Sequence, residues 1–114
     1  MKLPGVRRLV RLAKTVSTQT AARRLAEDGA PDGTVVWARS QTAGKGRMSR
    51  RWRSAPGGLY ASWLLRPSFA PERLGEFSLA CGAALAQALR GFGVKTAVKP
   101  PNDVLALCSD GKAR

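Results

Sequence analysis

The hydrophobic and polar positions at the start of the chain predict a strand, a helix and a second strand. In "VRRLVRLAKTV", hydrophobic residues on both sides of Arg11 favour a short strand over the start of a helix. "STQTAARRLAEDG" places its apolar residues on one helical stripe. Ser17 or Thr18 can cap this helix, and Gly29 is suited to end it. After the turn "APDG", the β-branched run "TVVWARS" predicts a strand over 34–39.

The later part of the chain predicts a strand over 59–65, the longest helix, and two short strands. Apolar residues recur at spacings of three and four in "APERLGEFSLACGAALAQALRGFG", and the predicted stripe is Leu74, Phe77, Cys81, Ala84, Leu85 and Ala88. "VKTAV" and "VLAL" flank the rigid turn "KPPND", and "CSDGKAR" is typical of a hairpin turn. The element order predicts an α+β fold, in which helices pack on one face of a mixed or antiparallel sheet.

Residues 41–52, "QTAGKGRMSRRW", show neither helical nor strand periodicity, so we expect a loop. Its two glycines would adopt positive φ and bring backbone N–H groups close to an anion. Its basic residues can neutralise phosphates, and Trp52 offers a flat face for a purine or an apolar wall. These features suit an adenylylation site, although the loop is neither a Walker P-loop nor a dinucleotide fingerprint. Taken alone, it fits a solvated basic loop or a nucleic-acid-binding arm as well.

Two shorter motifs carry weaker signals. In "KPPND", Lys99 can meet an anion, while Asn102 and Asp103 suit a ribose, a Mg²⁺ ion or a substrate amide. The plain alternative is a Pro-Pro turn with an Asx cap. In "STQT", the hydroxyls of Ser17 and Thr18 fit a helix cap or a ligand contact, and both roles can hold at once.

The composition narrows the choice of function. The chain has 114 residues, enough for one small domain, and a formal net charge of +13, which favours anionic partners. No acidic residue occurs from 33 to 71, although a basic proteome would give a similar balance. Histidine is absent, which excludes Ser-His triads and His general bases. The two cysteines, Cys81 and Cys108, are expected to be reduced and partly buried in a cytoplasmic protein without a signal peptide or membrane span.

The motifs occur together in one known family. The chain resembles the catalytic domain of biotin–protein ligases, the biotin–acetyl-CoA-carboxylase ligases. That family reads S-T-N, Q-T-A-G-R-G-R-x-G-R-x-W, G-G-L-Y-x-S and K-W-P-N-D-V in this order, and the chain has "STQ", "QTAGKGRMSRRW", "GGLYAS" and "KPPNDV". The resemblance covers residues 15–114. Lipoate ligases share the fold but not this basic loop.

The resemblance implies a class II synthetase-like fold and a two-step reaction that consumes ATP. Biotin would be activated as biotinyl-5′-AMP, with Mg²⁺ assisting, and then transferred to a lysine of the carrier domain of an acyl-CoA carboxylase. It assigns Lys45 and Arg47 as catalytic, with Arg47 retaining the adenylate. The implied biotin-binding residues are Ser17, Thr18, Gln41, Gly44, Lys45 and Arg47. The implied nucleotide-binding residues are Arg50, Trp52, Asn102 and Asp103, with Asp103 also the candidate metal ligand.

The chain departs from the family pattern at four positions. Lys45 replaces Arg, Ser49 replaces Gly, Gln19 replaces Asn, and Pro100 replaces the Trp of K-W-P-N-D. We also expect residues 1–114 to be an incomplete catalytic domain, without the C-terminal half of that domain and a C-terminal barrel. Lys112 lies close to a lysine of the family but is not assigned its role.

Two other functions stay open. The chain could be a basic nucleic-acid-binding module, but its loop lacks the row of aromatic residues that stacking on single strands requires. It could also be a relative that binds an adenylate or a carrier protein without catalysis. We expect no membrane association and no specific nucleic acid, and the oligomeric state stays open, with a homodimer as one option.

Overall fold

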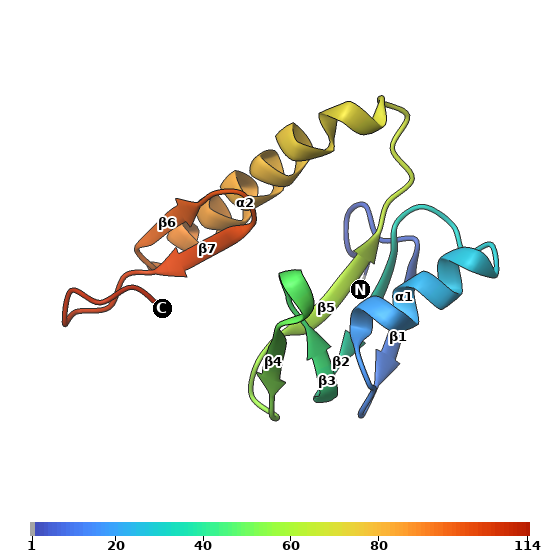
Figure 1. Ribbon diagram of the computed structural model, residues 1–114, viewed down its shortest axis with the longest axis horizontal. Coiled ribbons are helices and arrows are strands. Elements are labelled where there is room, and N and C mark those ends of the chain that lie inside the picture. Colours follow the sequence, from blue (N-terminus) through green and yellow to red (C-terminus); the bar gives the residue numbers. More distant parts are fainter. Residues whose placement is uncertain (1) are drawn as a thin grey trace. The chain divides into compact units, whose positions relative to one another are not determined.

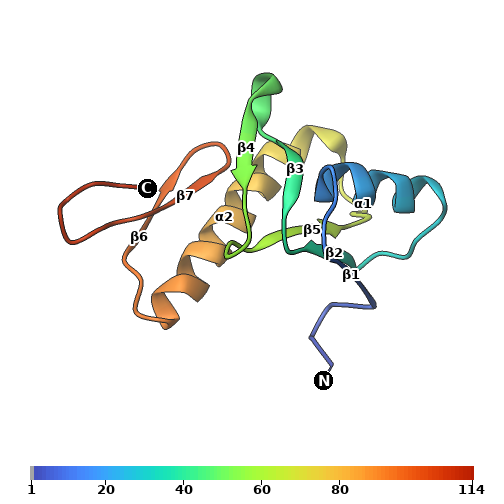
Figure 2. The same ribbon diagram turned by 90° about the horizontal axis from the view of Figure 1, so that it is seen from below.

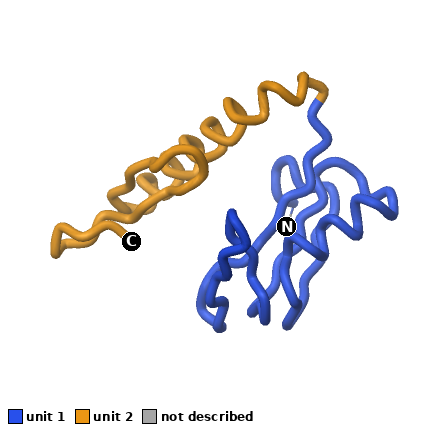
Figure 3. Tube along the Cα trace, viewed as in Figure 1, with its two compact units in different colours: residues 1–67 blue, residues 68–114 orange. Residues whose placement is uncertain are grey.

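The computed structural model describes residues 2–114, which form two compact units. Unit 1 extends to Pro67, and unit 2 comprises Ser68–Arg114 (Figure 3). The predicted strands and helices are all present, and the α+β class is confirmed. No helix within residues 2–114 combines the length and the apolar character needed to cross a membrane.

Unit 1 is built on a three-stranded sheet with the strand order β1-β2-β5. β1 (Arg8–Leu12) pairs in parallel with β2 (Thr34–Ala38), which pairs antiparallel with β5 (Tyr60–Leu64), so the sheet is mixed as expected. Helix α1 (Thr18–Glu27) connects β1 to β2 and lies along the sheet (Figure 1).

The core of unit 1 lies between α1 and one face of this sheet. The buried apolar residues are Ala22, Ala30, Val36, Ala38 and Leu64. The alternation along β2 explains the arrangement, because Val36 is fully buried whereas the next residue, Trp37, is 37% exposed. Trp37 therefore lies on the opposite face of the sheet, where the guanidinium carbon of Arg11 lies 5.8 Å from the centroid of its ring.

Residues 41–54 form a hairpin, so the expectation of a loop over 41–52 is wrong. β3 (Gln41–Lys45) pairs antiparallel with β4 (Arg51–Ser54), and a 3-10 turn, η1 (Arg47–Ser49), lies at the tip (Figures 1 and 2). A bulge interrupts the register between Gln41 and Gly44. Sequence periodicity missed these strands because most of their side chains are polar or exposed, so no apolar alternation marks a buried face.

Unit 2 pairs a long helix with a hairpin. A 3-10 turn, η2 (Pro71–Arg73), leads into α2 (Leu74–Gly91). β6 (Thr96–Lys99) then pairs antiparallel with β7 (Asp103–Ala106). The predicted turn in "CSDGKAR" is confirmed, because Leu107 bridges Ala113 in antiparallel fashion.

The face of α2 that packs on the hairpin differs from the predicted stripe. Ala86 is the buried residue of this helix, and a Cβ on Gly82 would lie 3.6 Å from Val98 and 3.9 Å from Val104. Leu74 and Leu85 of the predicted stripe are 51% and 53% exposed, and Cys81 is exposed rather than partly buried. Small residues face the hairpin because they let the helix backbone approach the strands closely.

Candidate functional site

The chain before α1 runs beside β3 and brings two sequence motifs together. The backbone N–H groups of Thr42 and Ala43 donate to the carbonyl oxygens of Thr15 and Val16 at 3.0 and 2.8 Å. Thr15 and Gln41 also form a parallel bridge. These backbone bonds place the "STQ" segment at the start of α1 next to the first residue of "QTAGKGR".

A buried group of polar side chains fills the junction between α1, β3, β4 and β5. We call it the polar cluster, and its members are Ser17, Thr18, Gln41, Ser54 and Ser62. Four of them are buried, and Gln41 is half-buried. Buried polar groups of this kind are stable only when they are hydrogen-bonded. The cluster is therefore an organised, buried polar site.

Gln41 joins the two sides of the polar cluster. Its Oε1 accepts from the backbone N–H of Thr18 at 2.8 Å, and its Nε2 donates to Oγ of Ser54 at 2.9 Å. On the other side, the hydroxyls of Thr18 and Ser62 lie 2.8 Å apart and share a hydrogen bond. The cluster thus offers hydroxyl and amide groups, which suit a neutral ligand with several donors and acceptors.

The cluster sits at the N-terminus of α1. Of the two predicted caps, Ser17 and Thr18, Ser17 is the N-cap, and its Oγ accepts from the backbone N–H of Gln19 at 3.2 Å. Gln41 accepts from the preceding N–H, that of Thr18, from outside the helix. Because N–H groups and the helix dipole point out of this end, it favours acceptor atoms of a ligand.

The two glycines of "GKG" allow close packing rather than positive φ, so that part of the loop hypothesis is wrong. A Cβ on Gly44 would lie 2.8 Å from both Nε2 of Gln41 and Oγ of Ser54. A Cβ on Gly46 would lie 2.9 Å from Nε1 of Trp52. Positive φ occurs instead at Met48 (57°) and at Ser49 (62°) in the tip.

The basic side chains lie on the hairpin beside the polar cluster. A hollow of about 430 Å³ is lined by Ala43, Gly44, Lys45, Gly46, Ser49, Arg50 and Arg51. Lys45 is opposite Arg51 in register, and both are exposed. The ion pairs found within residues 2–114 involve none of these cations. Their uncompensated charge can attract an anion such as a phosphate.

Arg47 and Trp52, which the resemblance assigns to the adenylate and the nucleotide, are not among the residues that line this hollow. Arg47 begins the tip turn and is exposed, and its carbonyl oxygen accepts from the N–H of Arg50 at 3.2 Å. Trp52 is opposite Gly44 in register and is 64% exposed. Its indole has a free face, so it is available to stack on a ligand.

The "KPPND" residues form the turn of the hairpin in unit 2. Lys99 and Asp103 are opposite each other in register, and Oγ of Ser78 donates to the carbonyl oxygen of Pro101 at 3.0 Å. Asn102 is exposed and Asp103 is half-buried. No group of three or more His, Cys, Asp or Glu side chains within the described chain is arranged to hold a metal ion. The nucleotide and metal roles of these two residues stay predictions.

Sequence reasoning missed two members of the polar cluster, Ser54 and Ser62. Ser62 had a detectable signal, because it occupies an inward position in the strand "YASWL", where an apolar residue is the usual choice. Ser54 had none, because β4 was not predicted as a strand.

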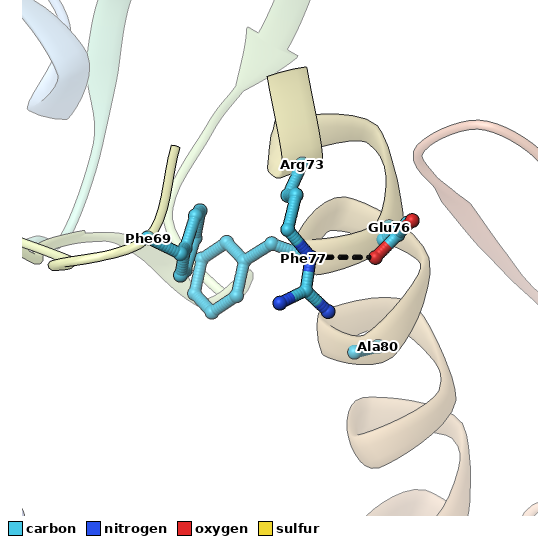
Figure 4. A pocket seen from close by; sticks show the side chains of 5 residues that line it. All are labelled: Phe69, Arg73, Glu76, Phe77 and Ala80. Atoms are coloured by element: carbon cyan, nitrogen blue, oxygen red, sulfur yellow. Dashed lines mark hydrogen bonds and ion pairs between the residues drawn. The ribbon is translucent and has the colours of Figure 1, made fainter. Parts of the chain in front are cut away.

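Unit 2 has a second concave surface, which no sequence motif predicted. Phe69, Arg73, Glu76, Phe77 and Ala80 line a hollow of about 350 Å³ (Figure 4). The rings of Phe69 and Phe77 are 5.2 Å apart, and Nε of Arg73 pairs with a Glu76 carboxylate oxygen at 3.0 Å. Both charged side chains are mostly exposed, so this surface lacks the buried polar groups that distinguish the polar cluster.

Comparison with known proteins gives consistent matches. A family model described as the biotin/lipoate A/B protein ligase family matches residues 12–112. The bifunctional ligase/repressor BirA of Bacillus spizizenii is 43% identical over 91 residues, which are 78% of this chain and 28% of that protein. BirA of Bacillus subtilis gives the same identity and coverage.

Solved structures agree with these sequence matches. The biotin protein ligase from Aquifex aeolicus in complex with biotin and ATP matches with a TM-score of 0.73 and 39% identity, over 86% of this chain and 41% of that chain. The fold is also shared by the biotin acetyl coenzyme A carboxylase synthetase from Helicobacter pylori, at a TM-score of 0.72 and 21% identity over 88% of this chain and 51% of that chain. The expected α+β fold and the resemblance drawn from the motifs are both confirmed.

Proposed function

Because the chain belongs to the biotin/lipoate A/B protein ligase family, we propose that its polar cluster and basic hairpin form the biotin- and ATP-binding part of a biotin–protein ligase. In the proposed reaction, a biotin carboxylate oxygen attacks the α-phosphorus of ATP, and pyrophosphate leaves. A lysine amine of a carrier domain then attacks the carboxyl carbon of biotinyl-5′-AMP, and AMP leaves. The observation that supports this most strongly is the meeting of "STQ" and "QTAGKGR" in one buried hydrogen-bonded cluster.

The polar cluster suits the ureido ring of biotin. This ring is neutral and has two N–H donors and one carbonyl acceptor. Ser17 and Thr18 supply hydroxyls, and Gln41 supplies an amide with a spare donor and a spare acceptor. Because a buried site built from hydrogen-bonding groups rejects ligands that leave those groups unpaired, we expect selectivity for a cyclic urea.

The basic hairpin suits the carboxylate and the phosphates. Negative charge develops on the α-phosphate and on the departing pyrophosphate during adenylate formation. In our proposal Lys45 and Arg47 stabilise this charge, with Gly44 against the biotin tail and Arg47 retaining the adenylate. Arg50 contacts the phosphates from the hollow, and Trp52 covers the adenine.

Mg²⁺ would bind together with the nucleotide. The ion is usually held by one or two carboxylates together with substrate phosphates, so the single carboxylate of Asp103 fits that type of donor set. When bound, the ion would neutralise phosphate charge. We propose that Asp103 orients it and that Asn102 contacts the nucleotide.

The extent of the chain limits what it is proposed to do alone. It spans 28% of the length of the Bacillus relatives and 41% of the Aquifex aeolicus chain. Transfer to a carboxylase carrier domain is therefore proposed for the whole catalytic domain, of which residues 1–114 supply the biotin-facing segments.

One observation favours a second function. The β3–β4 hairpin exposes the ring of Trp52 and five basic side chains. These are Lys45, Arg47, Arg50, Arg51 and Arg53. A basic two-stranded ribbon with an aromatic ring can bind nucleic acid through phosphates and stacking. Affinity for random DNA that falls steeply with salt would favour this function.

Calorimetry distinguishes these functions. The purified chain is titrated with biotin, and then with ATP and Mg²⁺ in the presence of biotin, at moderate salt. Our proposal predicts saturable biotin binding that becomes tighter with nucleotide, together with released pyrophosphate when the adenylate forms. Biotin binding without pyrophosphate release would indicate a non-catalytic relative. A folded chain that binds DNA but neither biotin nor ATP would contradict the ligase proposal.

A further inference from the structure

Ser54, a buried member of the polar cluster to which the proposed reaction assigns no role, holds the glutamine at the centre of that cluster. Ser54 is opposite Gln41 in register and is 5% exposed. Its hydroxyl accepts from Nε2 of Gln41 at 2.9 Å and donates to the carbonyl oxygen of Trp52 at 3.2 Å. We infer that Ser54 is a positioning residue, which fixes the direction in which the Gln41 amide presents its donor and its acceptor to a ligand. This inference rests on the proposed function, because it takes the ligand to be the cyclic urea of biotin.

Both ends of the Gln41 amide specify the same orientation. A glutamine amide can turn by half a rotation, which exchanges its oxygen and nitrogen, so its direction follows from its partners. The backbone N–H of Thr18 can only donate, so the atom 2.8 Å from it must be the amide oxygen. At the other end, the carbonyl oxygen of Trp52 can only accept and takes the single proton of Ser54. Ser54 must therefore accept from the amide nitrogen of Gln41.

The orientation matters because it leaves one donor and one acceptor free in a fixed order. An amide oxygen accepts two hydrogen bonds and an amide nitrogen donates two, and the network uses one of each. A cyclic urea held in one pose presents its carbonyl oxygen to the free donor and one of its two N–H groups to the free acceptor. In that pose a reversed amide would place donor against donor and acceptor against acceptor, and both bonds to the ligand would be lost.

A purely structural role for Ser54 makes a different prediction. A buried hydroxyl that only stabilises the fold would lower stability when removed, without changing the behaviour of Gln41. Thr34 is a matched control for this role, because it is fully buried in the same unit and its Oγ1 donates to the carbonyl oxygen of Pro31 at 2.7 Å. Thr34→Val removes that bond while keeping the side-chain shape, and Thr34 is not a member of the polar cluster.

The first measurement needs no ligand. The side-chain amide protons of Gln41 are identified by NMR, as the pair that is lost from the spectrum of Gln41→Glu. We expect them to exchange slowly with solvent in the wild-type chain and in Thr34→Val, and about tenfold faster in Ser54→Ala, because the nitrogen then loses its acceptor. Equal protection in Ser54→Ala and the wild-type chain would overturn the inference.

The second measurement is a double-mutant cycle for biotin binding. Ser54→Ala should weaken biotin binding about tenfold in the wild-type background, and less than twofold in the Gln41→Ala background, because Ser54 acts through Gln41. Thr34→Val should change the affinity less than twofold in either background. A tenfold loss that is the same in both backgrounds would contradict positioning through Gln41. A wild-type chain that binds no biotin would refute the proposed function instead, and the NMR exchange result would then decide whether Ser54 positions Gln41.

Discussion

The β6–β7 hairpin and the β3–β4 hairpin are held in different ways. The hairpin of β6 and β7 packs its side chains against α2, where Ala86 is buried and Gly82 lies next to Val98 and Val104. The hairpin of β3 and β4 is held by backbone bonds to the chain before α1 and by the polar cluster. The first depends on apolar contact, and the second on hydrogen bonds and close backbone approach. The second therefore carries the groups that can recognise a ligand.

Replacing Gly44 by alanine should have the largest effect. The added Cβ would lie 2.8 Å from the side chains of Gln41 and Ser54 and 3.0 Å from the carbonyl oxygen of Trp52. We expect Gly44→Ala to lower the free energy of unfolding by about 1–3 kcal/mol. Urea denaturation followed by circular dichroism measures this change, and we expect biotin binding to be lost with it.

Gly82, in the helix that packs on the β6–β7 hairpin, is the matched control. A Cβ on Gly82 would meet Val98 at 3.6 Å, which is ordinary contact, and alanine favours a helix over glycine by about 1 kcal/mol. Gly82→Ala should therefore be neutral or stabilising. Equal destabilisation by the two variants would contradict the distinction between the hairpins.

Enlarging Ala86, the buried residue of α2, tests the close packing of this helix on the β6–β7 hairpin. Ala86 is 1% exposed. It lies next to β6, where the hydroxyl of Thr96 donates to its carbonyl oxygen at 3.2 Å. Ala86→Leu should lower the free energy of unfolding by about 1–3 kcal/mol, because the helix must move away from the strands. Thermal denaturation measures the effect. Ala83→Leu, at an exposed position of the same helix, should change it by less than about 0.5 kcal/mol, and a similar loss in both variants would refute tight packing at Ala86.

Removing an exposed cation of the basic hairpin should affect function without affecting stability. Arg47 is exposed in the tip turn, so Arg47→Ala should change the free energy of unfolding by less than about 0.5 kcal/mol. In our proposal it should release biotinyl-5′-AMP about ten to a hundred times faster, which a filter-binding assay with labelled adenylate measures. Arg53→Ala is the control, because this residue is also exposed on β4 but has no assigned contact. Equal release rates in the two variants would argue against a special role for Arg47.

The smallest effect is expected at the tip itself. Ser49 has φ of 62°, a conformation that costs a side-chain-bearing residue about 1 kcal/mol and glycine almost nothing. Ser49→Gly should therefore raise the free energy of unfolding slightly, by at most about 1 kcal/mol. Chemical denaturation of the two chains in parallel measures it. A destabilised Ser49→Gly chain would show that the serine makes a favourable contact in the tip.

The sequence predicted the elements whose burial follows a repeating pattern. β1, α1 and β2 were found, α1 and β2 with their boundaries nearly right, and Ser17 was one of the two predicted helix caps. β3 and β4 were missed, because their pairing rests on backbone bonds and polar contacts that leave no apolar alternation. In α2 the apolar spacing identified the helix but not the face that packs on the hairpin, since small residues rather than leucines pack on these strands.

The sequence motifs predicted residues of the candidate site but not the hydrogen bonds that connect them. Ser17, Thr18 and Gln41 were chosen from the sequence, and the structure places them together. Ser62 had a signal of its own, but the pairing of the two serines in β4 and β5 with Gln41 and Thr18 could not be inferred, because the contacts span 13 and 44 residues along the chain. Such pairings depend on strand register, which local sequence patterns do not specify when both faces of a strand are polar.

The most direct test of the polar cluster as the biotin site is a biotin titration followed by NMR of the backbone amides. Our account predicts that the largest shifts occur at Ser17, Thr18, Gln41, Ser54 and Ser62, and that they saturate together with one dissociation constant. Shifts that occur only in residues 68–114, or an assigned and folded chain whose spectrum does not change with biotin, would contradict it.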